Sequence, residues 1–403
     1  METNYKFNRM EMAGSLGDLG TLLPIAIGMS LVNGLNPMGI FLSVGLFYIL
    51  SGIYFKITVP VQPMKVIGAY AIATGMTASQ VSASGLLVGC FLLLLGATNA
   101  ITVVGKYVPK SVVRGVQLST GVLLMAQGVR FIIGTSKFQL VRQAMEPYLT
   151  LQAIGPVPIG ILIGIIGGIL TLLLLENKRF PAGLFIVSGG IVFGILFGTH
   201  DGIQEAFHQL MGGLNLTGSL DFTFPTSADF TFALLALVLP QIPMTLGNAV
   251  IAYADLSQEY FHEKSTKITY KTACISMALA NFMSFFLGGM PLCHGAGGLA
   301  AHYRFGARTA GSNIIIGSIF VLFAILFGPH LLSLLYLIPM AVLGVLLLFA
   351  GSQLSLTIID IKERKDLFVA LLMLGITLAS NLAAAFIAGI GIAYAIKSNK
   401  LNV

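Results

Sequence analysis

The chain has 403 residues, of which 56% are hydrophobic and only 9% are charged, and its mean hydropathy is +0.92. This composition excludes a water-soluble protein of this size and indicates that lipid surrounds most of the chain. The formal net charge of +7 comes from basic residues scattered between apolar runs, so we predict no nucleic-acid partner.

Apolar runs follow one another along the whole chain and predict membrane-spanning helices, each of which needs about 20 residues. The seven runs of the first half cover residues 13–33, 37–55, 60–77, 82–100, 111–134, 157–175 and 181–198. The seven runs of the second half cover residues 230–254, 268–287, 290–303, 309–328, 331–350, 366–379 and 381–396. We therefore predict an all-α polytopic membrane protein with 14 transmembrane spans, although the last two runs are short enough for a re-entrant hairpin.

The positions of the basic residues test this arrangement, because cytoplasmic loops carry an excess of Lys and Arg. With the N-terminus in the cytoplasm, the basic residues of the loops fall inside, except for Arg130, Lys137 and Arg142. The acidic central loop also falls outside. We therefore predict a multi-pass protein of the cell membrane (inner or plasma membrane) with both termini cytoplasmic.

The two halves of the chain resemble each other. Residues Gly121–Gly128 of the fifth run and Gly344–Gly351 of the twelfth are identical at five of eight positions. Because each half has an odd number of spans, the second copy enters the membrane from the opposite side to the first. Such inverted repeats are found in many secondary transporters. We predict a 7+7 inverted repeat: spans 1–7 in residues 1–199, an extracytoplasmic connecting loop at 200–229, and spans 8–14 in residues 230–403.

Two short runs open on proline-rich segments at equivalent positions. Val59–Lys65 opens the third run and Gly288–Gly295 opens the tenth. Because proline is tolerated at a helix start, both predict an extended segment that leads into a half-helix inside the membrane, in spans 3 and 10. Non-helical backbone at that depth must be buried in protein or line a cavity. Two helix N-termini converging there would suit an anion.

Three polar residues, one in the first run and two at the break that opens the third, are further candidates. Asp18 lies inside the first run, where inserting a carboxylate into the membrane costs free energy. We therefore name it as the candidate coupling residue for protons or cations. The alternative is that it caps a helix. Lys65 could bring a positive charge to an oxyanion, with Gln62 donating an amide hydrogen bond. Alternatively, Lys65 pairs with a carboxylate such as Asp18 or extends to the membrane surface.

The eighth and tenth runs contain the other candidate substrate ligands, which are Gln241, Thr245, Asn248, Cys293, His294 and Gly295. The polar residues of the eighth run can replace the hydration shell of an anion, or else connect helices around a proline kink. His294 is a candidate site-lining or gating residue, with simple packing as the alternative.

No enzyme is expected. Neighbouring helical residues such as Cys293 and His294 point in different directions, so they predict no catalytic dyad. No second His or Cys stands at metal-ligand spacing. We predict no catalytic residues, no metal and no cofactor.

Four motifs resemble those of the molybdate transporter family, which is related to the sulfate permease (SulP-like) superfamily. They are Gly17–Thr21, Pro60–Lys65, Pro240–Pro243 and Pro291–Arg308. The resemblance implies a sulfate permease or uracil permease-like architecture, with a substrate-carrying core of spans 1–4 and 8–11, a gate of spans 5–7 and 12–14, and an elevator-like movement. Many sulfate permeases add a STAS domain, and none is expected here, because the chain ends at Val403 soon after its last run.

The resemblance also bears on the substrate. Similar nucleobase permeases bind with carboxylates in spans 8 and 10, where this chain has Gln241, Asn248 and His294, which favours an anion. We expect a secondary active transporter that imports a tetrahedral inorganic oxyanion, molybdate favoured over sulfate, with proton coupling. A sulfate transporter and an uncoupled anion channel of the same fold are the alternatives. The partners are the oxyanion, protons and the lipid bilayer; the oligomeric state is open, with a homodimer one option.

Overall fold

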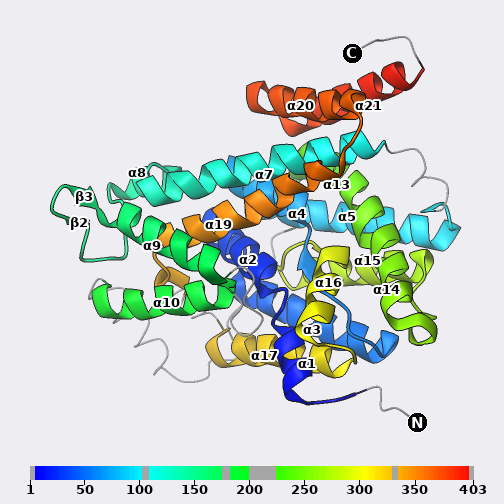
Figure 1. Cartoon of the computed structure of the whole chain (residues 1–403), viewed down its shortest axis with the longest axis horizontal. Helices are drawn as coiled ribbons and strands as arrows, with labels where there is room; N and C mark the ends of the chain where they lie inside the picture. Colours follow the sequence, from blue (N-terminus) through cyan, green and yellow to red (C-terminus); the bar gives the residue numbers. More distant parts are fainter. Residues whose placement is uncertain (1–4, 102–108, 175–181, 199–223, 329–334, 399–403) are drawn as a thin grey trace.

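The computed structural model describes residues 5–101, 109–174, 182–198, 224–328 and 335–398, and most of the connecting loop predicted at 200–229 lies outside them. The protein is a helical bundle (Figure 1). In the described residues, five helical stretches are long and apolar enough to cross a membrane, and further apolar helices are 10–17 residues long. The five are Pro37–Phe55, Ala78–Thr98, Lys110–Ile133, Ser227–Ser265 and Met340–Asp360.

The elements of the first half are α1 (Arg9–Ser15), α2 (Leu19–Asn33), α3 (Pro37–Phe55), β1 (Gln62–Pro63), α4 (Lys65–Thr74), α5 (Ala78–Thr98), α7 (Lys110–Ile133), α8 (Lys137–Arg142), β2 (Ala153–Ile154), β3 (Val157–Pro158), α9 (Ile159–Leu174) and α10 (Ala182–Phe197).

The second half opens with one long helical stretch made of α12 (Ser227–Ala233), η1 (Leu234–Val238), α13 (Leu239–Met244), η2 (Thr245–Ala252), α14 (Tyr253–Phe261) and η3 (His262–Ser265). The elements after it are α15 (Tyr270–Phe286), β4 (Leu292–Cys293), α16 (Ala296–Phe305), α17 (Gly311–Phe327), α19 (Met340–Ser355), η5 (Leu356–Asp360), α20 (Arg364–Ala379) and α21 (Leu382–Lys397).

Every predicted apolar run contains a helix, and the bounds differ most in three runs. The first run is broken between Ser15 and Leu19. The eighth continues beyond its predicted end to Phe261 and contains two π-helical segments, η1 and η2. The twelfth begins later than predicted, at Met340, because Pro339 stands at its N-cap and proline favours a helix start.

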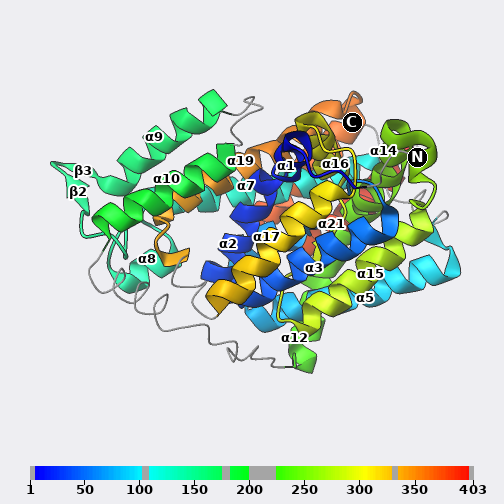
Figure 2. The ribbon, with the colours of Figure 1, turned by 90° about the horizontal axis from the view of Figure 1, so that it is seen from below.

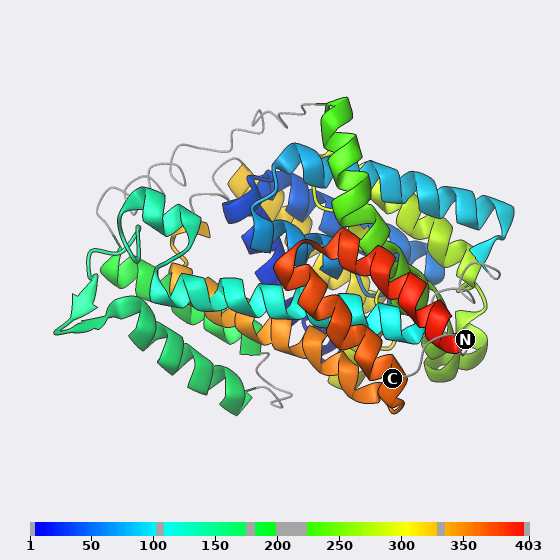
Figure 3. The same cartoon turned by 90° about the horizontal axis from the view of Figure 1, so that it is seen from above.

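The helices pack into two groups (Figures 2 and 3). In the first group, α1–α5 with α12–α17, helices α5, α15, α3 and α17 lie side by side. In the second group, α7–α10 with α19–α21, helix α7 packs against both α19 and α20. The groups meet where α4 lies on α7 and where α2 lies on α10 and α19.

Glycines allow α7 and α19 to touch backbone to backbone. A Cβ on Gly121 would lie 2.6 Å from the carbonyl oxygen of Gly351, and one on Gly351 would lie 2.6 Å from that of Gly121. Gly128 and Gly344 make the same reciprocal contact, at 2.5 and 2.6 Å. These four glycines begin and end the two similar octapeptides, which therefore lie antiparallel to each other.

Candidate functional site

The two proline-rich segments pair with each other in the interior of the first helix group. Strands β1 and β4 are antiparallel, with Gln62 opposite Cys293 and Pro63 opposite Leu292. The Met64 N–H adds a hydrogen bond of 2.9 Å to the carbonyl of Pro291. The ten-residue helices α4 and α16 start directly after this pair, so their N-termini are held close together.

Two buried asparagines satisfy the backbone of these extended segments. Asn313 on α17 accepts a hydrogen bond from the Val59 N–H (2.9 Å) and donates one to the Val59 carbonyl (2.8 Å). Asn281 on α15 does the same for Leu292, at 3.1 and 2.8 Å. Buried backbone groups need such partners, so these side chains make non-helical backbone possible here.

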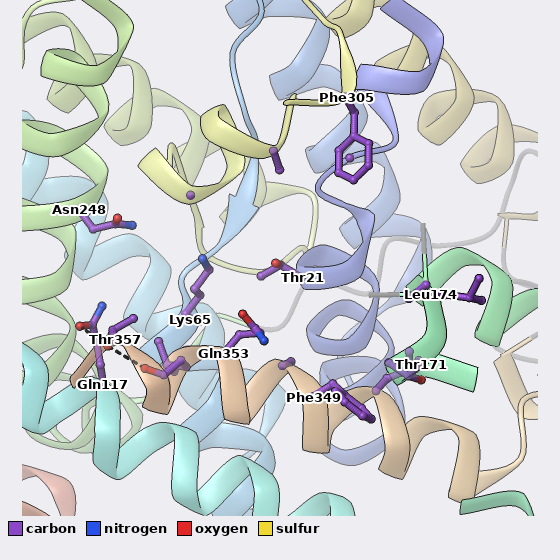
Figure 4. A pocket seen from close by; sticks show the side chains of 18 of the residues that line it. Thr21, Lys65, Gln117, Thr171, Leu174, Asn248, Phe305, Phe349, Gln353 and Thr357 are labelled. Carbon is purple, nitrogen blue, oxygen red and sulfur yellow. Dashed lines mark hydrogen bonds between the residues drawn. The ribbon is translucent and has the colours of Figure 1, made fainter. Parts of the chain in front are cut away.

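A cavity of about 470 Å³ lies between the two helix groups (Figure 4). Its polar lining from the first group is Thr21, Lys65 and Asn248, together with the backbone of Gly17 and Gly297. Its polar lining from the second group is Gln117, Thr171, Gln353 and Thr357. The polar part of the lining therefore consists of neutral hydrogen-bonding groups and one ammonium group, and the rest of the wall is mostly apolar.

Lys65 is the first residue of α4 and reaches into this cavity (Figure 4). Its Nζ lies 4.0 Å from the position that a Cβ on Gly297 would take, beside the first turn of α16. Among the described residues it forms no ion pair, and the N–H groups of Ala296, Gly297 and Gly298 have no acceptor there. A cation and an uncapped helix start thus face the same space, which suits an anion.

The start of α4, in contrast, is capped by a side chain. Gln241 Oε1 accepts hydrogen bonds from the N–H groups of Val66 (3.1 Å) and Ile67 (3.2 Å). Gln241 Nε2 donates to Thr245 Oγ1 at 2.9 Å. Both side chains are buried and do not line the cavity, whereas Asn248, in the π-helical segment η2, does. The sequence predicted that the N-termini of both half-helices are free to bind an anion. Among the described residues, the N-terminus of α4 is capped by Gln241 and that of α16 remains free.

Asp18 lies in the break between α1 and α2, 3% exposed. Its Oδ1 accepts a hydrogen bond of 2.6 Å from Gln62 Nε2, while its Oδ2 has no hydrogen-bond partner among the described residues. A Cβ on Gly298 would lie 2.5 Å from that Oδ2 and 2.7 Å from Gln62 Nε2. Asp18 thus stands directly against the first turn of α16, and it interacts electrostatically with Lys65 without forming an ion pair.

Because Gly295 has no side chain, Gln62 can pack directly against its backbone. A Cβ there would lie 1.9 Å from Gln62 Oε1 and 3.6 Å from Asn248 Nδ2. Gln62 and Gly295 are therefore packed together behind the cavity wall, where a side chain on residue 295 could not fit.

His294 and Cys293 lie away from the cavity. The His294 ring is fully buried, with Nδ1 2.9 Å from the carbonyl of Pro60 and Nε2 3.0 Å from Ser276 Oγ. Since the carbonyl can only accept, Nδ1 carries the proton and Nε2 accepts from the serine. Cys293 Sγ lies 3.7 Å from the Pro63 carbonyl. In this conformation both residues hold the strand pair in place.

Several cavity residues were not among the sequence candidates. They are Thr21 on α2, Thr171 on α9 and the second-group residues Gln117, Gln353 and Thr357. A glutamine inside an apolar run, as at Gln117, is the signal that could have identified it, because buried amides in membranes usually have partners or tasks. Among the described residues, no group of three His, Cys, Asp or Glu could hold a metal ion.

The arrangement of helices is shared with known anion transporters. The transmembrane domain of the cyanobacterial bicarbonate transporter BicA matches with a TM-score of 0.63 and 16% identity, over 94% of this chain and 97% of that one. Murine Slc26a9, an anion transporter solved in the inward-facing state, matches with a TM-score of 0.69 and 14% identity, over 99% and 70% of the chains. At these identities, the likeness shows the fold alone.

Sequence similarity identifies the family. The family model described as "Molybdate transporter of MFS superfamily" matches residues 10–124 and 233–354. Molybdate transporter 2 of Arabidopsis thaliana is 30% identical over 93% of this chain and 84% of its own length. Molybdate transporter 1 of Chlamydomonas reinhardtii is 32% identical over 96% and 91%. The chain therefore belongs to the molybdate transporter family, a family of multi-pass membrane transporters and not of enzymes.

Proposed function

We propose that this protein is a secondary active transporter that imports a tetrahedral oxyanion, with molybdate favoured over sulfate. The observation that carries the proposal is the Lys65 ammonium group, which faces the cavity beside the uncapped first turn of α16. A dianion placed there would exchange its water shell for charge-assisted hydrogen bonds. The names of the plant and algal relatives support molybdate as the substrate.

The proposed architecture is a 7+7 inverted repeat, with residues 1–199 and 230–403 as its two copies. The antiparallel contact between the two similar octapeptides of α7 and α19 supports it, as do the strand pairing and equal length of α4 and α16. In this proposal, α4 and α16 are the half-helices. The first helix group is the mobile core, the second is the gate, and the core carries the anion past the gate.

Asp18 is the proposed proton-coupling residue. Its Oδ2 is buried, has no hydrogen-bond partner in the described part of the chain and faces α16, so a proton on this oxygen would change the charge next to the anion. Uptake by the wild type should then depend on a pH gradient. We expect Asp18→Asn, which keeps the shape of the side chain and removes its titration, to lose this dependence. An unchanged pH dependence in Asp18→Asn would contradict the assignment.

Uptake of labelled molybdate into proteoliposomes tests the substrate. We expect Lys65→Ala to weaken molybdate binding by about tenfold to 150-fold, since a hydrogen bond to a charged group contributes about 1.5–3 kcal/mol. Lys271→Ala is the matched control, because Lys271 is exposed at the start of α15. Equal competition by sulfate would favour a sulfate transporter. Unitary currents in a planar bilayer, without coupled uptake, would favour a channel.

A further inference from the structure

The wall that the second helix group contributes to the cavity contains a buried amide. Gln117 on α7 is 3% exposed and lines the cavity. Figure 4 shows it beside Thr357, on the wall formed by α7 and the segment that follows α19. It belongs to the proposed gate and not to the helices that carry Lys65.

The orientation of this amide is fixed by its neighbours. Gln117 Oε1 lies 2.7 Å from Arg114 Nη1 and 3.0 Å from Thr357 Oγ1. A guanidinium group can donate hydrogen bonds but cannot accept them, so the atom facing Arg114 must be the amide oxygen. The donor Nε2 therefore points elsewhere, and in the described part of the chain it has no acceptor.

Arg114 is itself held in place. Its Nε donates a hydrogen bond of 2.8 Å to Asp360 Oδ1, and its Nη2 pairs with Asp360 Oδ2. Lys110 Nζ adds a contact of 3.1 Å to the same carboxylate. This two-point contact between planar groups fixes the guanidinium, which in turn fixes Gln117.

We propose that Gln117 Nε2 donates a hydrogen bond to the transported oxyanion, so that the gate supplies part of the binding site. The inference rests on the proposed function. It gives a role to a mostly buried amide, 3% exposed, which lines the cavity and whose donor has no protein partner in the described part of the chain. The Gln353 amide, exposed in the same cavity, adds a second donor from α19.

The sharpest test is Gln117→Glu, which changes one atom and keeps the shape. The carboxylate still accepts from Arg114 and Thr357, so a purely structural role is preserved or strengthened. Its second oxygen replaces the Nε2 donor and repels a dianion. We expect an unfolding midpoint at or above that of the wild type, with molybdate affinity at least about tenfold weaker. Wild-type affinity in this variant would overturn the inference.

A second comparison uses two glutamines of the same helix. Gln127 on α7 is also buried, at 7% exposure, but does not line the cavity. We expect Gln117→Leu to weaken molybdate binding and to change the ratio of molybdate to sulfate affinity, while Gln127→Leu changes neither. Equal effects of the two substitutions would contradict a contact between Gln117 and the anion.

Arg114 is the positioning residue, and a double-mutant cycle measures its role. We expect Arg114→Gln to weaken binding in the wild type but to add no further loss in Gln117→Leu. Additive losses would show that Arg114 does not act through Gln117. Failure of the wild type to take up molybdate would contradict the proposed function, whereas normal uptake with an unaffected Gln117→Glu would contradict only the present inference.

Discussion

At the scale of single residues, Gly298 shows how closely the candidate coupling and binding groups pack. It lies in the first turn of α16, where a Cβ would stand 2.5 Å from Asp18 Oδ2 and 2.8 Å from Pro60 Cβ. A methyl group at this position must displace the carboxylate, the Gln62 amide or the strand pair behind them. The space that a side chain would occupy is therefore already taken by the site itself.

We expect Gly298→Ala to lower stability by about 1–3 kcal/mol, the usual cost of overpacking, and to reduce molybdate uptake more strongly than this loss explains. Thermal unfolding and uptake by the same preparation would measure both effects. Gly391→Ala on α21 is the control, because nothing lies within 4 Å of the added Cβ. Normal uptake by Gly298→Ala would show that the Asp18 and α16 contact is not needed for transport.

At the scale of elements, the extended segments before α4 and α16 depend on side chains that bond to their backbone. Asn313 satisfies both peptide groups of Val59, and Asn281 satisfies both of Leu292. Neither asparagine is accessible to water. Without its asparagine, each segment would leave two buried backbone groups unpaired in a region from which water is excluded.

We expect Asn281→Ala and Asn313→Ala each to destabilise the protein strongly, since each orphaned buried group costs about 1–3 kcal/mol. The exposed helix cap Asn381 provides the comparison, because Asn381→Ala should cost only about 1 kcal/mol. Unfolding midpoints in detergent would rank the three variants. Equal midpoints would mean that the extended segments find other partners.

The elements that sequence could predict are those with local signals. The helix start after Pro63 follows from the fixed backbone angle of proline and its missing N–H; the same signal stands at Pro339, and the prediction that the twelfth run begins at residue 331 overlooked it. The pairing of Gln62 with Cys293 and the capping of α4 by Gln241 join residues far apart in the chain, and no local pattern encodes them. The sequence placed Lys65 and Asn248 among the candidates, and both line the cavity; whether they bind the anion stays a prediction.

At the scale of the whole molecule, the cavity lies between the two helix groups and extends toward one end of the bundle. Its lining includes Leu174 and Ala182, which flank the loop predicted to be cytoplasmic, and Phe305, next to the basic end of α16. Thr357 on the same lining precedes Asp360 and its partners Lys110 and Arg114. If those basic residues face the cytoplasm, this conformation opens inward.

A single cysteine in the cavity would test this state from both sides of the membrane. Ala350 on α19 lines the cavity and Ala341 on the same helix is fully buried, so cysteines at these positions form a matched pair. Cys90 is the exposed native cysteine and would be replaced by serine, while Cys274 and Cys293 are buried.

Membrane-impermeant thiol reagents should then modify Ala350→Cys in inverted vesicles but not in intact cells, and should leave Ala341→Cys unmodified. Molybdate should slow the reaction, because the anion occupies the same space as the reagent. Intact cells should show modification only when an outward concentration gradient of molybdate drives the core past the gate, because the cysteine is then exposed on the outer side for part of each cycle. Modification only from outside would show that the cavity opens to the outer side of the membrane in this conformation. A reaction rate that molybdate does not change would show that the cavity is not part of the transport path.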